Sequence, residues 1–314
     1  MTNNSTADSG GVAAQTAQLS TEQRNPSSVA LDEMSSIEVL ALLNSEDRRA
    51  VEAVAASLPD VAELVDAAVE RVRRGGRVHY FGAGTSGRLA ILDAAELLPT
   101  FNLPPDVVVA HIAGGADAVL RAVENAEDSR ELGSQDAAGL GPDDIAIGVT
   151  ASGITPYVGG ALEQARSRGA ATALIACNPE PALGPLADIV IVADTGPEVL
   201  SGSTRLKAGT AEKLILNGFS TAVMVALGRT WSNLMVSVVA TNEKLRVRTT
   251  RILSQALSIS AEQSRALLDA SDGELKTALV SALVGVDSQR ARELLAASSE
   301  SVRDALALGA ADNA

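Results

Sequence analysis

Three junctions in the chain combine glycine with serine or threonine in a pattern that could bind an anion. They are GAGTSGR (82–88), TASGITPY (150–157) and LSGSTRLKAGT (200–210), and each joins an apolar run to a helix-like segment. The backbone N–H groups at a helix N-terminus are free, and the helix dipole favours negative charge there, so such a junction can hold a phosphate. Taken singly, each junction is also explained by a tight turn or an ordinary helix cap.

The three junctions taken together favour one shared phosphate site. In an open parallel sheet, ligands bind beyond the carboxyl ends of the strands, where such loops can converge. Hydroxyl and backbone groups would bind the phosphate, and Lys207 would add a mobile positive charge. The predicted phosphate-binding residues are Gly84, Thr85, Ser86, Gly87, Ser152, Gly153, Thr155, Ser203, Thr204 and Lys207.

The first junction formally fits the dinucleotide-binding pattern G-x-G-x-x-G, but its context argues against a nucleotide. That pattern requires an acidic residue about 20 residues further on, after a second strand. The next strand-like run, 107–111, is followed by AGGADA and leaves only Asp117, which comes late. A P-loop is excluded because no G-K-[ST] follows. We therefore expect no nucleotide cofactor.

Composition and charge narrow the class of protein further. Of the 314 residues, 46% are hydrophobic and only 2% aromatic, which suits aliphatic parallel strands covered by helices. The net charge of −14 argues against a nucleic acid or an anionic membrane surface as partner. The single cysteine, Cys177, fits a reducing cytoplasm. The two histidines, His79 and His111, lie in strand-like runs, which predicts packed side chains and no metal site.

Strand-like and helix-like segments alternate along the middle of the chain. Apolar runs predict five strands, at 78–81, 107–112, 145–150, 173–176 and 189–193. Helical periodicity covers 35–56, 59–74, 86–98, 116–131, 156–168 and 210–227. The alternation predicts an α/β fold with a five-stranded parallel sheet flanked by helices.

The two ends of the chain differ from this middle part. Residues 1–20 have neither a basic nor an apolar leader segment and predict a disordered tail. No apolar run approaches the roughly 18 residues that would span a membrane. Residues 21–250 are the predicted main domain, with its N-terminal helices. Residues 251–314 contain short capped helical segments that predict a small three-helix C-terminal subdomain.

Several motifs, in order along the chain, resemble those of the N-acetylmuramic acid 6-phosphate etherases. They include GAGTSGRLAILDAAELLPTF, IAGGADAVLRAVENAEDS, TASGITPYV, GPEVLSGSTRLKAGTAEKLILN and NLMVSVVATNEKLRVR, and the match runs from about residue 21 to the end. The resemblance implies the sugar isomerase (SIS) fold, a flavodoxin-like sandwich. It also implies an amino-sugar 6-phosphate substrate whose C3 lactyl ether is cleaved to D-lactate without metal or nucleotide, in the recycling of bacterial cell-wall sugars.

The resemblance further implies which residues perform the reaction. In the open-chain sugar the aldehyde makes the C2 proton acidic, so a base at C2 and an acid at the C3 oxygen allow lactate to leave before water adds. In the family two glutamates do this, and the matching positions are Glu96 as the acid and Glu127 as the base. From the residues alone, Glu124 and Asp128 are alternatives to Glu127 in the same charged run.

The chain departs from the family pattern at a few positions. Ile154 replaces the usual arginine, which could make a bidentate contact with a carboxylate or phosphate. The other differences are Ala95, Leu97, Leu98 and Asn125. Two alternatives stay open beside the etherase. One is a non-catalytic sugar-phosphate sensor, and the other is a sugar-phosphate isomerase, which needs a base at C2 but no acid at C3.

The spacing within the first βα unit bears on the assembly. If residues 86–96 form one helix, Glu96 lies about 15 Å along its axis from the phosphate loop, farther than a hexose phosphate easily reaches. We therefore expect a homodimer in which Glu96 serves a site near the subunit interface. The apolar helix at 210–227 could supply contact surface.

Overall fold

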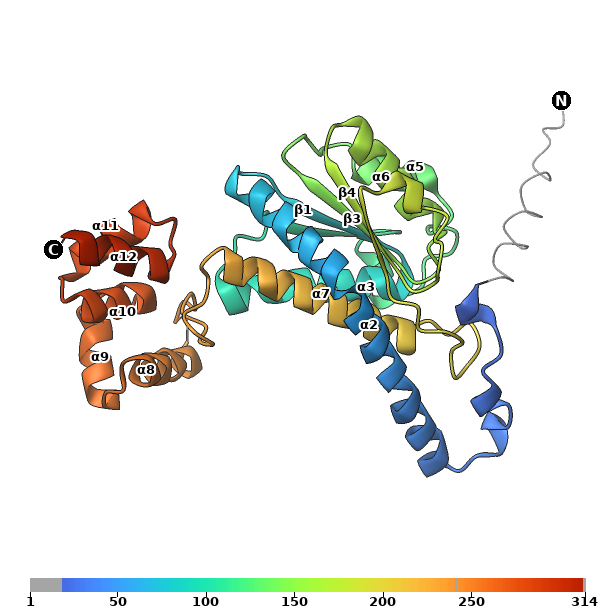
Figure 1. The fold of residues 1–314 in the computed structure, drawn as a ribbon, viewed down its shortest axis with the longest axis horizontal. Helices are drawn as coiled ribbons and strands as arrows, with labels where there is room; N and C mark the ends of the chain where they lie inside the picture. Colours follow the sequence, from blue (N-terminus) through green and yellow to red (C-terminus); the bar gives the residue numbers. More distant parts are fainter. Residues whose placement is uncertain (1–18, 241, 313–314) are drawn as a thin grey trace. The chain divides into compact units, whose positions relative to one another are not determined.

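The structure is a computed structural model that describes residues 19–240 and 242–312. Its centre is a parallel sheet of β1 (Val78–Gly82), β2 (Val108–Ile112), β3 (Ile145–Thr150), β4 (Ala171–Ala176) and β5 (Ile189–Val192). The strands pair in the order β2-β1-β3-β4-β5, which confirms the predicted five-stranded parallel sheet (Figure 1). Gly82 pairs with Ile112 of β2 and with Val149 of β3, so the carboxyl ends of these three strands lie at one level.

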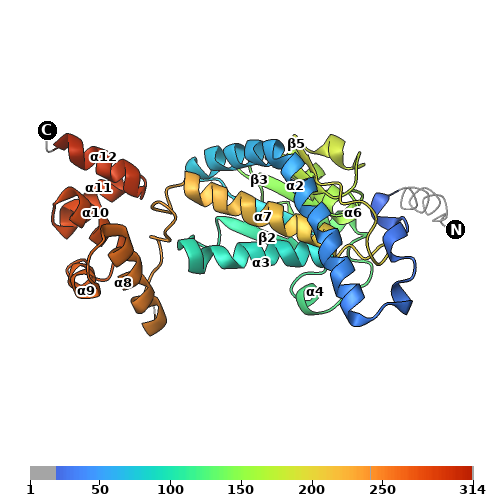
Figure 2. The ribbon, with the colours of Figure 1, turned by 60° about the horizontal axis from the view of Figure 1, so that its bottom comes forward.

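Helices cover both faces of the sheet (Figures 1 and 2). One face carries α2 (Ser36–Arg73), α3 (Gly84–Phe101) and α7 (Lys207–Ala226), and the other carries α5 (Arg130–Asp136) and α6 (Pro156–Ser167). Short turns of helix also occur, namely η1 (Ser20–Glu22), η2 (Pro26–Ser28), η3 (Leu31–Glu33), α4 (Asp117–Leu120) and η4 (Gly184–Leu186). Because both faces are covered, every residue of β1 and β3 is buried, and these strands appear in the sequence as unbroken apolar runs.

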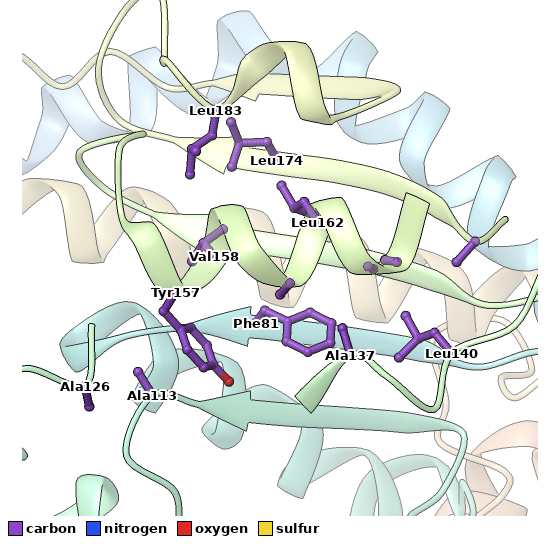
Figure 3. Packing of buried hydrophobic residues seen from close by; sticks show 14 residues of the cluster. Phe81, Ala113, Ala126, Ala137, Leu140, Tyr157, Val158, Leu162, Leu174 and Leu183 are labelled. Atoms are coloured by element: carbon purple, nitrogen blue, oxygen red, sulfur yellow. The ribbon is translucent and has the colours of Figure 1, made fainter. Parts of the chain in front are cut away.

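The core between the sheet and the α5–α6 layer is aliphatic apart from two rings (Figure 3). Phe81 of β1 and Tyr157 of α6 are fully buried. Around them pack Ala137, Leu140, Val158, Leu162 and Leu174. Tyr157 Oη donates a 2.5 Å hydrogen bond to Asp136 of α5, so the polar atom of the ring is satisfied. The two helices cross at glycines, since a Cβ on Gly133 or Gly160 would lie 1.9 Å from a carbonyl oxygen of the other helix.

The first long helix differs from the prediction. The sequence predicts helices at 35–56 and 59–74, whereas α2 is continuous through Pro59 and begins at a capping box formed by Ser35. Buried residues continue on both sides of the proline, among them Val54, Val61, Leu64, Val65 and Ala68. This packing outweighs the one backbone hydrogen bond that a proline cannot donate.

A second predicted helix, at 116–131, is mostly absent. The structure has only the short α4 there, followed by a loop that leads to α5. Arg121 is extended, and Asn125 adopts a left-handed conformation with φ of 62°, which a right-handed helix cannot contain. This loop carries Glu127, so the correction concerns the candidate site directly.

The described residues divide into two compact units. The first comprises 19–94 and 106–219 and contains the sheet, and the second comprises 95–105 and 220–312. The second unit contains α8 (Glu243–Leu257), α9 (Ala261–Asp269), α10 (Leu275–Val284), α11 (Ser288–Ala297) and α12 (Val302–Asp312). Where the sequence predicts three helices, these five surround a separate core that includes Leu253, Leu279 and Leu295.

Two predictions concern the ends of the chain and the membrane. The disordered tail predicted at 1–20 lies outside the described residues, except for Leu19 and Ser20. Within the described ranges, every helix is too short or too polar to cross a membrane.

Candidate functional site

The fold places two of the three predicted junctions next to each other. β1 and β3 are neighbours, but the chain leaves β1 for β2 on one side and leaves β3 for β4 on the other. This reversal is the topological switch point, and open α/β sheets bind ligands in the crevice beyond the strands that flank it. Residues 83–87 follow β1 and residues 151–155 follow β3, so both junctions border the expected ligand position.

Helix α3 begins directly after β1 because glycines allow the strand and the helix to approach closely. A Cβ on Gly87 would lie 2.6 Å from Ile112 Cγ1 and 2.8 Å from the carbonyl oxygen of Gly82. Gly84 has φ of 54°, in the left-handed region that favours glycine. The first backbone N–H groups of α3, from Gly84 to Ser86, therefore lie at the carboxyl edge of the sheet, where they can bind an anion.

Three hydroxyl groups gather at the end of β3. Thr150 Oγ1 lies 2.7 Å from Thr155 Oγ1 and 3.2 Å from Ser152 Oγ. The N–H groups of Gly153 and Ile154 donate to Thr150 Oγ1 and Ser152 Oγ, respectively, and so fix the turn. The sequence analysis proposes Ser152 and Thr155 as ligand groups but misses Thr150, whose place as the last residue of a strand was an available signal.

The third junction reaches the first through the start of α7. Ser203 and Thr204 lie half-buried in the turns that precede this helix. Gly209 packs against the first junction, where a Cβ on it would lie 3.5 Å from Thr85 Cγ2. The third junction is also held by the N-terminal segment, because the Gly202 N–H donates to the Thr21 carbonyl oxygen at 3.1 Å. Ser203 and Thr204 stay predicted ligand groups.

Lys207 is buried and paired rather than mobile. It is 1% exposed, and its Nζ donates to Glu46 Oε2 of α2 at 2.5 Å. Burial acts to raise the pKa of Glu46, but hydrogen bonds from Lys207 and Asn25 outweigh it and lower that pKa. The backbone N–H of Lys207 donates to the buried Glu198 at 3.0 Å. The expectation of a mobile charge is therefore corrected, because a buried ammonium needs a fixed anionic partner and this one fastens α7 to α2.

A further buried carboxyl group lies beside the first junction. Glu212 of α7 is fully buried, and its Oε1 accepts a 2.7 Å hydrogen bond from Ser86 Oγ. Its Oε2 has no hydrogen-bond partner among the described residues. Burial raises the pKa of Glu212 to about 8, against the opposing effect of the Ser86 bond. Sequence reasoning misses Glu212, because an acidic residue next to Lys213 in a helix is expected to be solvated surface.

Glu127 lines a cavity that includes the start of α3. The cavity has a volume of about 160 Å³ and lies between the first junction and the loop after α4. Its lining includes Ala83, Gly84, Arg88, Arg121, Glu124, Asn125 and Glu127. Glu124 therefore shares the cavity with Glu127, whereas Asp128 is not part of its wall. Both glutamates are exposed, as an open substrate site requires.

The loop that carries Glu127 is attached to the elements on either side. Arg88 of α3 donates from Nε to the Val119 carbonyl oxygen at 2.9 Å. The Tyr157 N–H, in the first turn of α6, donates to the carbonyl oxygen of Glu127 at 2.9 Å. Ser129 then caps α5 by accepting the N–H of Leu132. These hydrogen bonds fix the position of the Glu127 loop beside the first junction, although the loop has no regular secondary structure.

Glu96 lies far along α3 from the first junction. The helix is continuous from Gly84 to Phe101, so the ten residues from Ser86 to Glu96 span about 15 Å of its axis. Glu96 is exposed, and on the same helix Leu92 and Leu98 are 52% and 49% exposed. The continuous helix on which the dimer expectation depends is therefore present.

The two histidines lie together in the sheet. His79 Nδ1 is 3.0 Å from His111 Nε2, and the ring of His111 stacks on that of Phe81 with the centroids 4.6 Å apart. In residues 19–240 and 242–312, no three His, Cys, Asp or Glu side chains are arranged to hold a metal ion.

The strand order and the junctions at its switch point define the class of protein, a sugar isomerase (SIS) domain. The family model "Glucokinase regulatory protein N-terminal SIS domain" matches residues 60–166. A solved phosphoheptose isomerase from Francisella tularensis shares the fold with a TM-score of 0.50, at 24% identity, covering 61% of this chain and 100% of that one.

Longer relatives identify the family within this class. A protein named N-acetylmuramic acid 6-phosphate etherase from Streptomyces avermitilis is 49% identical, with 92% of this chain and 94% of the relative covered. A protein of the same name from Thermobifida fusca is 54% identical, with 84% of this chain and 86% of the relative covered. The chain belongs to the N-acetylmuramic acid 6-phosphate etherase family, as the motifs indicate.

Proposed function

We propose that this chain is a carbon–oxygen lyase that cleaves the D-lactyl ether of N-acetylmuramic acid 6-phosphate to N-acetylglucosamine 6-phosphate and D-lactate. The observation that carries the proposal is the shared cavity: Glu127 and the first junction line the same space, beyond the carboxyl ends of β1 and β2. A phosphate on the junction and a carboxylate facing the sugar are what an elimination on a sugar phosphate requires. The family relationship supports the same reaction.

The reaction proceeds by elimination and hydration on the open-chain sugar. The 6-phosphate binds to the N–H groups at the start of α3 and to the hydroxyls after β3 and before α7. The Glu127 carboxylate takes the C2 proton, the electron pair forms the C2–C3 double bond, and the C3–O bond breaks as Glu96 protonates the departing lactyl oxygen. Water then adds at C3 and a proton returns to C2, so one water is consumed for each lactate released.

The two carboxyl groups come from different subunits of a homodimer in this proposal. It is supported by the unbroken α3, which carries Glu96 about 15 Å away from the junction of its own chain. The exposed Leu92 lies one turn before Glu96 on the same side of α3 and offers an apolar side chain that a second copy of the chain can cover. Glu127 of one protomer and Glu96 of its partner then complete one site.

Two features refine the setting of this site. Ile154 stands half-buried in the turn after β3, where an arginine could reach a substrate carboxylate, so the lactyl group is held without a bidentate guanidinium contact. The only cysteine of the sequence, Cys177, is a buried free thiol, which is consistent with our placing the reaction in the cytoplasm.

Lactate release from N-acetylmuramic acid 6-phosphate tests the function. The wild type should release lactate, whereas Glu127→Gln and Glu96→Gln, which keep the size but cannot transfer a proton, should lose turnover by at least about 100-fold. Both variants should still bind N-acetylglucosamine 6-phosphate. Glu124→Gln is the matched control in the same cavity wall and separates the two candidate bases. A wild type that binds the sugar phosphate but releases no lactate would be a sensor, and interconversion of glucose 6-phosphate and fructose 6-phosphate would indicate an isomerase.

A further inference from the structure

Glu212 is a buried acid whose surroundings differ from those of the other buried glutamates in its unit. Glu46 has the ammonium of Lys207, and Glu198 accepts two backbone N–H groups at the start of α7. Glu212 has a single hydroxyl partner, Ser86, and its second oxygen has none among the described residues. An ionised carboxylate in such a place is costly, so the neutral form is favoured.

The electrostatic neighbours of Glu212 do not offset this cost. The Cys177 thiol, on the loop after β4, interacts with Glu212 and also with Glu198 and Asp194, and burial raises its pKa well above the usual value. The thiol therefore stays neutral and supplies no counter-charge to Glu212. The Lys207 ammonium already pairs with Glu46. Glu212 thus keeps its proton near neutral pH, with a pKa raised by burial to about 8.

The protonation state of Glu212 decides what the Ser86 hydroxyl can do. An ionised carboxylate can only accept hydrogen bonds. It would therefore accept the hydrogen bond from the Ser86 hydroxyl, and only the lone pairs of Oγ would be left for a further contact. A neutral carboxyl group can donate to Oγ instead, which frees the Ser86 proton for another acceptor. Ser86 stands in the first turn of α3, where an anionic ligand would be that acceptor.

We propose that Glu212 is a positioning residue that donates its proton to Ser86 Oγ and so directs the Ser86 hydroxyl at the phosphate of the substrate. The inference rests on the proposed function, because it assumes that the first junction binds the 6-phosphate. The proposal adds Glu212 to the residues of the phosphate site. Glu212 does not touch the ligand and acts on it only through its hydrogen bond to Ser86. The arrangement also excludes a full negative charge on Glu212 while phosphate is bound.

Three single variants and one double variant test the proposal, with N-acetylglucosamine 6-phosphate as the probe for binding by calorimetry. Glu212→Gln keeps the size and a donor for Ser86 Oγ, so its Kd at pH 7 should match that of the wild type within about twofold. Glu212→Met keeps the length but has no donor, so its Kd should rise about tenfold, as for one lost hydrogen bond to a charged ligand. Ser86→Ala should weaken binding similarly, and adding Glu212→Met to it should weaken binding little further.

The pH profile separates positioning from packing. Between pH 7 and 9 the sugar phosphate stays a dianion, because its second pKa is about 6. The wild-type Kd should therefore rise as Glu212 ionises, while that of Glu212→Gln stays flat. Lys213→Met, at the exposed neighbouring position of α7, controls for loss of a side chain on this helix. Thermal unfolding of each variant checks that it is folded.

Other outcomes overturn the proposal. They are a Glu212→Gln variant that binds as poorly as Glu212→Met, a Glu212→Met variant of wild-type affinity, or parallel pH profiles for the wild type and Glu212→Gln. Because the probe is bound and not turned over, these results are independent of lactate release. A chain that binds the probe as described but releases no lactate would refute the proposed reaction and leave the role of Glu212 standing.

Discussion

Arg88 of α3 donates a 2.9 Å hydrogen bond from Nε to the carbonyl oxygen of Val119, the residue before the end of α4. A second bond of 3.2 Å runs from the same guanidinium to the carbonyl oxygen of Arg121. Together they fasten the loop that carries Glu127 to α3, whose first turn belongs to the first junction. The path of this loop past the junction therefore depends on a few individual hydrogen bonds, two of them from Arg88, rather than on regular secondary structure.

Replacing Arg88 by methionine should misplace Glu127. We expect kcat for lactate release to fall by about 10- to 100-fold, the usual cost of displacing a catalytic group by about 1 Å, with Kd for N-acetylglucosamine 6-phosphate changed by less than about twofold. Arg166→Met is the control, because Arg166 also donates to a backbone carbonyl, that of Pro185. An equal loss of affinity and turnover would mean that Arg88 binds the sugar phosphate itself.

Mixing two inactive variants should restore activity if the site is shared between subunits. In a heterodimer of Glu96→Gln and Glu127→Gln, one of the two sites combines the intact Glu127 of one chain with the intact Glu96 of the other. Random exchange should then recover about a quarter of wild-type turnover per chain. Titrating one purified variant into the other while following lactate release measures the recovered turnover. Mixtures that form dimers but stay inactive would place both glutamates in one chain.

The buried pair of Lys207 and Glu46 should govern stability. Lys207→Met leaves the Glu46 carboxylate buried without its cation, so we expect a loss of about 3–5 kcal/mol in the free energy of unfolding. Adding Glu46→Leu should recover much of this loss, because an apolar pair replaces a buried ion pair at little cost. Urea unfolding measures both effects. If the restored double variant binds N-acetylglucosamine 6-phosphate as the wild type does, Lys207 is no phosphate ligand, whereas lost binding in a stable protein would make it one.

Position 154 should control recognition of the lactyl carboxylate. With Ile154→Arg, we expect KM for N-acetylmuramic acid 6-phosphate to fall by about tenfold through a bidentate contact. The Kd for N-acetylglucosamine 6-phosphate, which has no lactyl group, should be unchanged. Ile154→Met, which alters the side chain without adding charge, is the control. If the arginine tightens binding of both ligands alike, it acts on the phosphate.

Acid should destabilise the first unit through His79. This side chain is 6% exposed, and burial together with His111 lowers its pKa to about 4. In the unfolded chain a histidine pKa is about 6.5, so between these values the unfolded state binds a proton that the folded state does not. The free energy of unfolding should therefore decrease as the pH falls from about 6.5 to 4, by up to about 1.4 kcal/mol per pH unit. His79→Leu should flatten this slope in urea titrations, and an unchanged slope would assign it to other groups.

The sequence predicts those parts of the fold whose signal is local. The strands appear as apolar runs because the sheet is buried on both faces, and residues 145–150 are predicted at the bounds of β3. The helix predicted at 116–131 is wrong because helical periodicity does not reveal that Asn125 is left-handed. The break predicted before Pro59 is wrong because tertiary packing along α2 is invisible in one segment.

In the candidate site, too, the residues with a local sequence signal are predicted, and those that depend on tertiary contacts are not. Thr85, Ser86, Ser152 and Thr155 are predicted from glycine- and hydroxyl-rich strand ends, a pattern confined to a few adjacent residues. Glu212 is missed because its surroundings depend on neighbours in space, whereas Thr150 could have been found as the last residue of a predicted strand. Ser86 and Glu212 are separated by 126 residues, and their hydrogen bond exists only once α3 and α7 are packed. Lys207 is predicted as mobile for the same reason, since its partner Glu46 lies 161 residues earlier in the chain.

The N-terminal segment that holds the third junction links the site to the order in which the chain can fold. The Thr21 N–H donates to Asn178 Oδ1, 157 residues later, and the Thr21 carbonyl oxygen accepts from Gly202 beyond that. Thr21 leaves the ribosome early, but it can form these hydrogen bonds only after most of the first unit has been synthesised. Closing so long a loop is entropically slow. The third junction should accordingly be among the last parts of this unit to form, and ligand binding should report completion of folding rather than collapse of the sheet.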